Sequence, residues 1–181
     1  MREALSSMLE ETRRLSDLVD SLLLLARADT GAALPSLQEV ELEALVHEVR
    51  ETLFVLAEEK RQLIEVQAEK LLARADRELL RLALLNLVDN AIRYSPKGSS
   101  IRLHIWHAEN CAVVEVIDQG PGIAREHQQK IFERFYRIDK ARSCASGGAG
   151  LGLAITRWAV ERQGGRIELK SEEGQGSLSE S

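Results

Sequence analysis

Apolar residues recur every three or four positions through residues 1–29, which predicts one long amphipathic helix. The spacing is that of a coiled-coil seam, with charged residues on the other faces. Additional leucines, such as Leu9, Leu18 and Leu23, widen the apolar side beyond the seam of a two-stranded coil. This width favours a helix bundle, so residues 1–30 are predicted to be a bundle-forming helix.

The helical pattern stops at Gly31 and Pro35, which marks residues 31–36 as a linker. One mixed domain is predicted over residues 37–181. Strands are expected at 37–40, 62–67, 100–107, 111–117 and 166–171, with helices at 41–59, from the N-cap Asp76 to about Tyr94, and at 151–163, and an ordered stretch near 124–133. Helices set apart from largely adjacent strands predict an α+β fold, a two-layer sandwich with the helices on one face of a mixed sheet.

The composition is that of a folded, core-forming protein, with 44% hydrophobic and 29% charged residues. A net charge of -5 without a basic stripe gives no support for nucleic-acid binding. Two cysteines, Cys111 and Cys144, are too few for a disulfide scaffold, so a cytosolic location is expected. The apolar run 22–26 falls far short of the roughly 20 residues that cross a bilayer, and no apolar run in the chain is longer. Any membrane anchor of a parent protein is therefore expected outside this chain.

The helix after Asp76 carries two amides, Asn86 and Asn90, one turn apart on one face. Magnesium bound to phosphates takes oxygen ligands, and an amide oxygen adds no negative charge beside a triphosphate. In an isolated pair of this kind, the amide side chain would more often cap a helix or reach across to a neighbouring strand. The interpretation as a ligand site therefore depends on two further motifs.

The second motif, Asp118-Gln-Gly120-Pro-Gly122-Ile123, follows an apolar strand. A carboxylate there can accept a hydrogen bond from the exocyclic amine of adenine, whereas guanine presents a carbonyl at that position. The glycines allow a sharp turn and a close approach of the backbone to a base. On its own this pattern is equally typical of an ordinary turn after a strand.

The third motif is a run of glycines, Gly147, Gly148, Gly150 and Gly152, leading into the last helix. Backbone N–H groups at a helix start bind phosphate well, although such a loop can also be only a hinge. The spacing is neither that of a Walker loop nor that of a Rossmann fingerprint. We expect both roles, with residues 121–149 closing over the ligand as a lid.

Within the expected lid, Phe132 and Phe135 are spaced to pin the segment to the body of the domain. Arg134 and Arg137 could reach a terminal phosphate as charged donors. A solvated helix face is the alternative explanation for each arginine.

Taken together and in this order, the motifs resemble the ATP-binding domain of sensor histidine kinases over residues 37–177. The resemblance implies ATP and Mg²⁺ as cofactors, with Asn90 as the metal ligand and Arg134 and Arg137 positioning the γ-phosphate. The residues that it places around the nucleotide are Asn86, Asn90, Arg93, Tyr94, Asp118, Gly120, Gly122, Ile123, Gly148, Gly150, Leu151 and Gly152.

Residues 12–29 resemble the second helix of the dimerisation hairpin of these kinases. The resemblance implies a protein histidine kinase that transfers the γ-phosphate of Mg-ATP to a histidine on such a hairpin. Its further implications are a homodimer, a response regulator as the next phosphate acceptor, and the cytoplasmic portion of a parent protein anchored in the bacterial inner membrane.

Two features of the sequence bear on whether this chain is a kinase, a hydrolase or only a nucleotide-binding module. Hydrolytic relatives with the same fold carry a glutamate base where this chain has Asn86, and asparagine cannot take a proton, so transfer is favoured over hydrolysis. His47, His104, His107 and His127 all lack the sequence context of an acceptor histidine. This fragment is therefore not expected to autophosphorylate. A nucleotide-binding and dimerisation module, or a related ATPase or serine kinase, is the alternative.

The end of the chain predicts one structural deficit. Gly174-Gln-Gly176-Ser177 resembles the last glycine motif of the family, after which an apolar strand usually completes the sheet. Only Leu178-Ser-Glu-Ser181 follows here. We therefore expect the sheet to lose an edge strand and the domain to lose stability.

Overall fold

The computed structural model describes residues 34–109, 111–138, 149–172 and 176–180, together with residues 12, 19, 22–24 and 26. The helices of the domain are α2 (Leu42–Glu59), α3 (Arg77–Tyr94), α4 (Arg125–Gln128), the 3-10 helix η1 (Lys130–Phe132) and α5 (Gly152–Arg162). The strands are β1 (Gln38–Glu41), β2 (Leu63–Ala68), β3 (Leu72–Ala75), β4 (Ser100–Ala108), β5 (Cys111–Ile117), β6 (Glu168–Glu172) and β7 (Gly176–Glu180). The predicted bundle-forming helix lies almost entirely outside the described residues.

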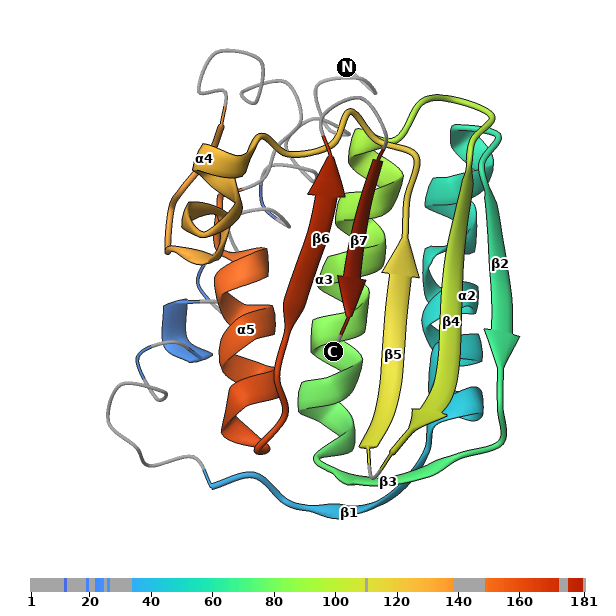
Figure 1. Cartoon of the computed structure of the whole chain (residues 1–181), viewed down its shortest axis with the longest axis vertical. Coiled ribbons are helices and arrows are strands. Elements are labelled where there is room, and N and C mark those ends of the chain that lie inside the picture. The colour runs from blue at the N-terminus through green and yellow to red at the C-terminus, as the bar shows by residue number, and fades with distance from the viewer. Residues whose placement is uncertain are drawn as a thin grey trace.

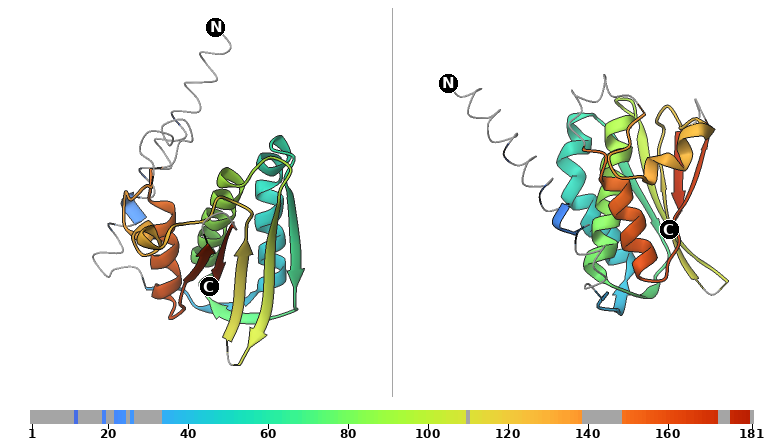
Figure 2. Two further views of the ribbon diagram at one scale, coloured as in Figure 1. Left: turned by 45° about the horizontal axis from the view of Figure 1, so that its top comes forward. Right: turned by 90° about the vertical axis from the view of Figure 1, so that its left-hand side faces the viewer.

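The main sheet has five strands in the order β2-β4-β5-β7-β6. Its first pair, β2 and β4, is parallel, and the other pairs are antiparallel. Helices α2, α3 and α5 cover one face of this sheet, as the side view shows (Figures 1 and 2). The predicted α+β fold, a two-layer sandwich on a mixed sheet, is confirmed.

Alternation along the strands explains which face the helices cover. In β4, Ile101, Leu103 and Ile105 are fully buried, while the residues between them face the other side of the sheet. Buried positions on α2 and α3, including Val49 and Val88, complete the core from the helical layer. Burying a side chain of this size contributes about 1.5–3 kcal/mol, so this layer contact is the main source of stability.

The strand expected to be lost is present. Residues 176–180 form β7, which pairs with β6 over five residues and with β5 over three. The prediction that the sheet loses an edge strand is therefore wrong, and β7 occupies an interior position of the sheet. A second two-stranded sheet, of β1 and β3, was only half predicted, because β3 has four residues and no strong pattern.

The start of α3 is held by its own N-cap residue, and its end is held by a lysine from a distant segment. At its start, the carboxylate of Asp76 accepts hydrogen bonds from the backbone N–H groups of Glu78 and Leu79, each at 3.1 Å, which confirms the predicted N-cap. At its end, Lys60 Nζ donates to the carbonyls of Ile92 and Arg93, each at 2.7 Å. Helix α3, which carries the first of the three predicted motifs, is thus fixed at both termini.

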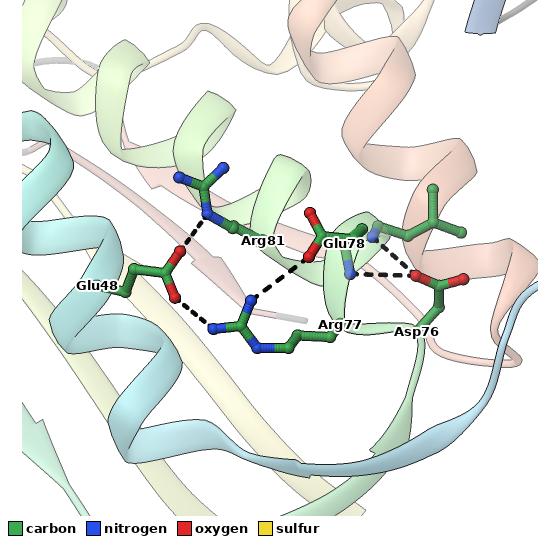
Figure 3. Close-up of polar contacts among 6 residues, drawn as sticks. Glu48, Asp76, Arg77, Glu78 and Arg81 are labelled. Atoms are coloured by element: carbon green, nitrogen blue, oxygen red, sulfur yellow. Dashed lines mark hydrogen bonds and ion pairs between the residues drawn. The ribbon is translucent and has the colours of Figure 1, made fainter.

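One ion-pair cluster joins α2 to α3 (Figure 3). Glu48 on α2 pairs with Arg77 and with Arg81, whose Nε lies 2.6 Å from Glu48 Oε1. The two guanidinium groups hold the pKa of the Glu48 carboxyl below its usual value of 4.5. All three side chains are partly exposed, so the cluster makes a modest contribution to stability.

We expect Glu48→Gln to lower stability slightly at pH 7 and to have no effect in acid. Because folding lowers the pKa of Glu48, its contribution is complete above the unfolded-state pKa and disappears as the pH falls through the folded-state value. Urea midpoints of both proteins between pH 7 and pH 3 measure this difference. Glu58→Gln, at an exposed position of the same helix, is the matched control. Equal midpoints at pH 7 would show that the cluster does not stabilise the fold.

No helix in the described part of the chain combines the length and the apolar character needed to cross a bilayer.

Candidate functional site

The polar face of α3 carries the first motif. Its core face is formed by residues such as Leu84, Leu87 and Val88, which leaves Asn86 and Asn90 on the other side, one turn apart. The Nδ2 atom of Asn86 is buried and has no hydrogen-bond partner among the described residues. Buried polar atoms are nearly always satisfied, so an unpaired donor here indicates a place where a ligand supplies the acceptor.

The start of α5 lies directly against this amide. A Cβ atom added at Gly152 would lie 3.4 Å from Asn86 Oδ1, at van der Waals contact, so the two helices approach each other closely here. Among the described residues, no side chain caps the first N–H groups of α5. Free N–H groups at the positive end of a helix suit a phosphate. Of the predicted phosphate residues, Gly152 therefore lies beside Asn86 and Gly150 and Leu151 directly precede it, whereas Gly148 lies outside the described residues.

The second motif packs on the C-terminal end of α3. Asp118 Oδ1 accepts a hydrogen bond of 2.7 Å from the backbone N–H of Gly120. A Cβ added at Gly120 would lie 2.8 Å from that same carboxylate oxygen and 3.5 Å from the carbonyl oxygen of Tyr94. Gly122 has a φ of 72°, in the left-handed region that glycine adopts readily. Helix α3 thus contacts both glycine motifs, one at Asn86 and the other at Tyr94.

Arg93 has a neighbour that the sequence analysis did not single out. Its Nε lies 2.7 Å from Asp89 Oδ2, one turn earlier on α3. The spacing of opposite charges four residues apart was the available signal. This ion pair restrains the guanidinium of Arg93. Asp89 directly precedes Asn90, so the pair lies close to the predicted metal ligand on the same helix.

The expected lid is anchored differently from the prediction. Phe135 is 57% exposed and has a φ of 64°, so its ring does not pin the segment. The backbone does so instead, because the N–H of Phe135 donates to the carbonyl of Gly150 at 2.9 Å. Ile131 is buried in the described part of the segment, and the centroid of the Phe132 ring lies 5.9 Å from Arg157 Cζ.

The charged residues of the same segment follow η1. Arg134 and Arg137 each interact with other groups of the fold. Their approach to a terminal phosphate stays a prediction. The side chain of His127 is only 24% exposed, and its Nδ1 lies 2.7 Å from the hydroxyl of Tyr136. The other histidines lie on α2 and β4, as predicted.

Comparison with known proteins agrees with this arrangement. Residues 75–179 match the family described as histidine kinase-, DNA gyrase B- and HSP90-like ATPases. The chain is 37% identical to the sensor-like histidine kinase SenX3 of Mycolicibacterium smegmatis, over 98% of this chain and 46% of that protein. It thus spans less than half the length of this curated relative.

Two solved structures resemble the whole chain or most of it. Full-length ShkA in complex with AMPPNP superimposes with a TM-score of 0.82 and 31% identity, over 99% of this chain and 37% of that one. The catalytic domain of the histidine kinase ThkA superimposes with a TM-score of 0.71 and 28% identity, over 80% of this chain and 93% of that domain. The chain therefore belongs to the histidine kinase-, DNA gyrase B- and HSP90-like ATPase family, as a catalytic domain of the histidine kinase type.

Proposed function

We propose that this chain binds Mg-ATP and transfers the γ-phosphate to a histidine on a dimerisation hairpin. The observation that carries the proposal is the buried Nδ2 of Asn86, which has no hydrogen-bond partner among the described residues and belongs to a side chain that lies against the start of α5. An acceptor oxygen from a phosphate would satisfy this donor. The similar structure of ShkA is a complex with AMPPNP, an ATP analogue, which supports the same class of ligand.

The residues divide between the two ends of the nucleotide. Asp118, Gly120, Gly122 and Ile123 would hold adenine, with the Asp118 carboxylate accepting from the exocyclic amine. At the other end, Arg93 and the N–H groups of the α5 start would bind phosphates. The remaining residues of the proposed site are Asn86, Asn90, Tyr94, Gly148, Leu151, Arg134 and Arg137.

Asn90 would supply an oxygen ligand to Mg²⁺, which neutralises phosphate charge when bound. Arg134 and Arg137 would orient the γ-phosphate. None of these residues exchanges a proton, so catalysis by this chain would be positioning and charge stabilisation.

Transfer is favoured over hydrolysis by the chemistry of Asn86. A hydrolase needs a base that takes a proton from the attacking water, and an amide cannot do this. With ATP and Mg²⁺ but no acceptor hairpin, we therefore expect almost no release of inorganic phosphate. Steady release at many turnovers per hour would contradict transfer and favour an ATPase.

The partners follow from the same proposal. Residues 1–30 would be part of a dimerisation helix, residues 31–36 the linker and residues 37–181 the catalytic domain, with residues 121–149 as the lid. The parent protein would be a homodimer, anchored in the bacterial inner membrane, which passes phosphate to a response regulator. The four histidines lie in the ATP-binding part, which favours a fragment that acts only on a separate hairpin.

Calorimetry tests the nucleotide site. We expect micromolar ATP binding that weakens when EDTA removes magnesium, and at least tenfold weaker binding of both ATP and ADP by Asp118→Ala, roughly the loss of one charged hydrogen bond. Asp118→Asn is the control for charge, since it keeps an acceptor oxygen. A folded chain that binds no ATP would refute the proposed function.

A further inference from the structure

Three hydrogen bonds tie the loop after Asp118 to the edge of the main sheet. The backbone N–H of Ile123 donates to Ser171 Oγ at 2.8 Å. The side-chain amide of Gln128 donates to the carbonyl of Ile123 at 2.8 Å and to the carbonyl of Ser171 at 2.9 Å. Ser171 lies on β6, an edge strand of the sheet, and Gln128 ends α4, which lies beside β6 (Figure 1).

Ile123 is therefore held through both of its backbone polar groups. Ser171 is 48 residues away in the sequence, and all three residues are partly buried. A buried N–H or carbonyl that loses its partner pays a desolvation cost, so the backbone would move to recover one. The three bonds thus determine where the chain runs at this point.

The other end of the same loop is also anchored. Gln119 Oε1 accepts a hydrogen bond of 3.2 Å from the backbone N–H of Ser100 at the start of β4. Gly120 is bonded to Asp118, and Gly122 supplies the left-handed turn between the two anchors. The loop is thus hydrogen-bonded to β4 at one end and to β6 at the other. A shift at Ile123 would therefore be passed to Gly120 and Gly122.

We propose that Ser171 and Gln128 are positioning residues for the adenine end of the nucleotide site. They would act through Ile123, by holding the loop where its glycines approach the base and where Asp118 meets the exocyclic amine. The inference rests on the proposed function. Neither side chain needs to touch the nucleotide, and Gln128 also lines a cavity of about 570 Å³ whose other lining residues are outside the proposed nucleotide site.

Gln128 and its neighbour provide a matched pair of variants. Both N–H groups of the Gln128 amide are used, so Gln128→Glu replaces two donors by an acceptor that faces two carbonyls. Gln129→Glu introduces the same charge at the next, exposed position, which takes no part in the three bonds. Ser171→Ala removes the hydroxyl, and Ser171→Thr retains it on a residue that strands accept well.

The experiment combines nucleotide affinity with amide exchange in the full chain. For Ser171→Ala and Gln128→Glu we expect the Kd to rise about three- to tenfold for ATP and ADP alike, because both share the adenosine part. The exchange of the Ile123 amide should become faster. Gln129→Glu and Ser171→Thr should keep wild-type affinity and exchange. Loss of affinity confined to ATP would instead indicate an effect on the terminal phosphate and contradict the inference.

Unchanged affinity for both nucleotides, in a variant whose Ile123 amide exchanges faster, would overturn the inference and leave the proposed function standing. If the unmodified chain does not bind ATP or ADP, the proposed function fails, and this inference fails with it. Thermal unfolding of each variant separates a local effect from loss of the fold. Ser171→Ala and Gln128→Glu change two different elements. If one of these variants does not fold, the other still tests the inference.

Discussion

Asn90→Ala should remove the magnesium dependence of ATP binding while the domain stays folded. Asn90 is not among the buried residues of α3, and alanine is the best helix former. The amide oxygen that would bind Mg²⁺ is then missing. Since loss of even an outer-shell partner weakens metal binding by about 10–100-fold, we expect at least a tenfold weaker Kd for ATP in magnesium.

Titrations with magnesium and with EDTA measure this effect. For Asn90→Ala the two conditions should give the same affinity, because the metal no longer adds binding energy. Asn90→Asp is the informative control, since it retains an oxygen ligand but adds a negative charge beside the phosphates. It should keep a magnesium response with weaker ATP binding. A wild-type magnesium response in Asn90→Ala would exclude Asn90 as the ligand.

The long elements could be predicted from periodicity because each has one buried face. Helix α2 was expected at 41–59 and spans Leu42–Glu59, and the alternation of β4 placed it within one residue. Short elements have no such signal. β3 has four residues, and β7 contains only one large apolar residue, so its position depends on ladders to β5 and β6.

The site was predicted in part for a related reason. Asparagine pairs, an acid at a strand end and glycine runs are local patterns, so they can be recognised in the sequence. The bond between Ile123 and Ser171 joins residues far apart, and no local pattern indicates it. Phe135 shows the opposite failure. Its aromatic character suggested a buried anchor, whereas the left-handed backbone turns its ring outward and makes its N–H the anchor.

Of the two described glycines in the third motif, Gly150 should tolerate an alanine substitution less well than Gly152. Gly150 has a φ of 73°, and a Cβ there would lie 2.9 Å from the carbonyl oxygen of Tyr136 and 3.0 Å from the carbonyl carbon of Phe135. These are backbone atoms, so no side-chain rotation relieves the contact. The hydrogen bond from Phe135 to Gly150 must lengthen or break. We expect a loss of at least about 2 kcal/mol in unfolding free energy, from left-handed strain together with the clash.

Gly164→Ala separates the two causes. Gly164 has a φ of 82°, but nothing lies within 4 Å of its added Cβ, so this variant carries the strain without the clash. It should lose only about 1 kcal/mol, as expected for a left-handed alanine, and should bind ATP normally. Gly150→Ala should also weaken ATP binding, because the start of α5 moves with Phe135. Urea unfolding and calorimetry of both variants measure the difference. Equal destabilisation with unchanged ATP affinity would mean that the contact between Phe135 and Gly150 does not shape the phosphate end of the site.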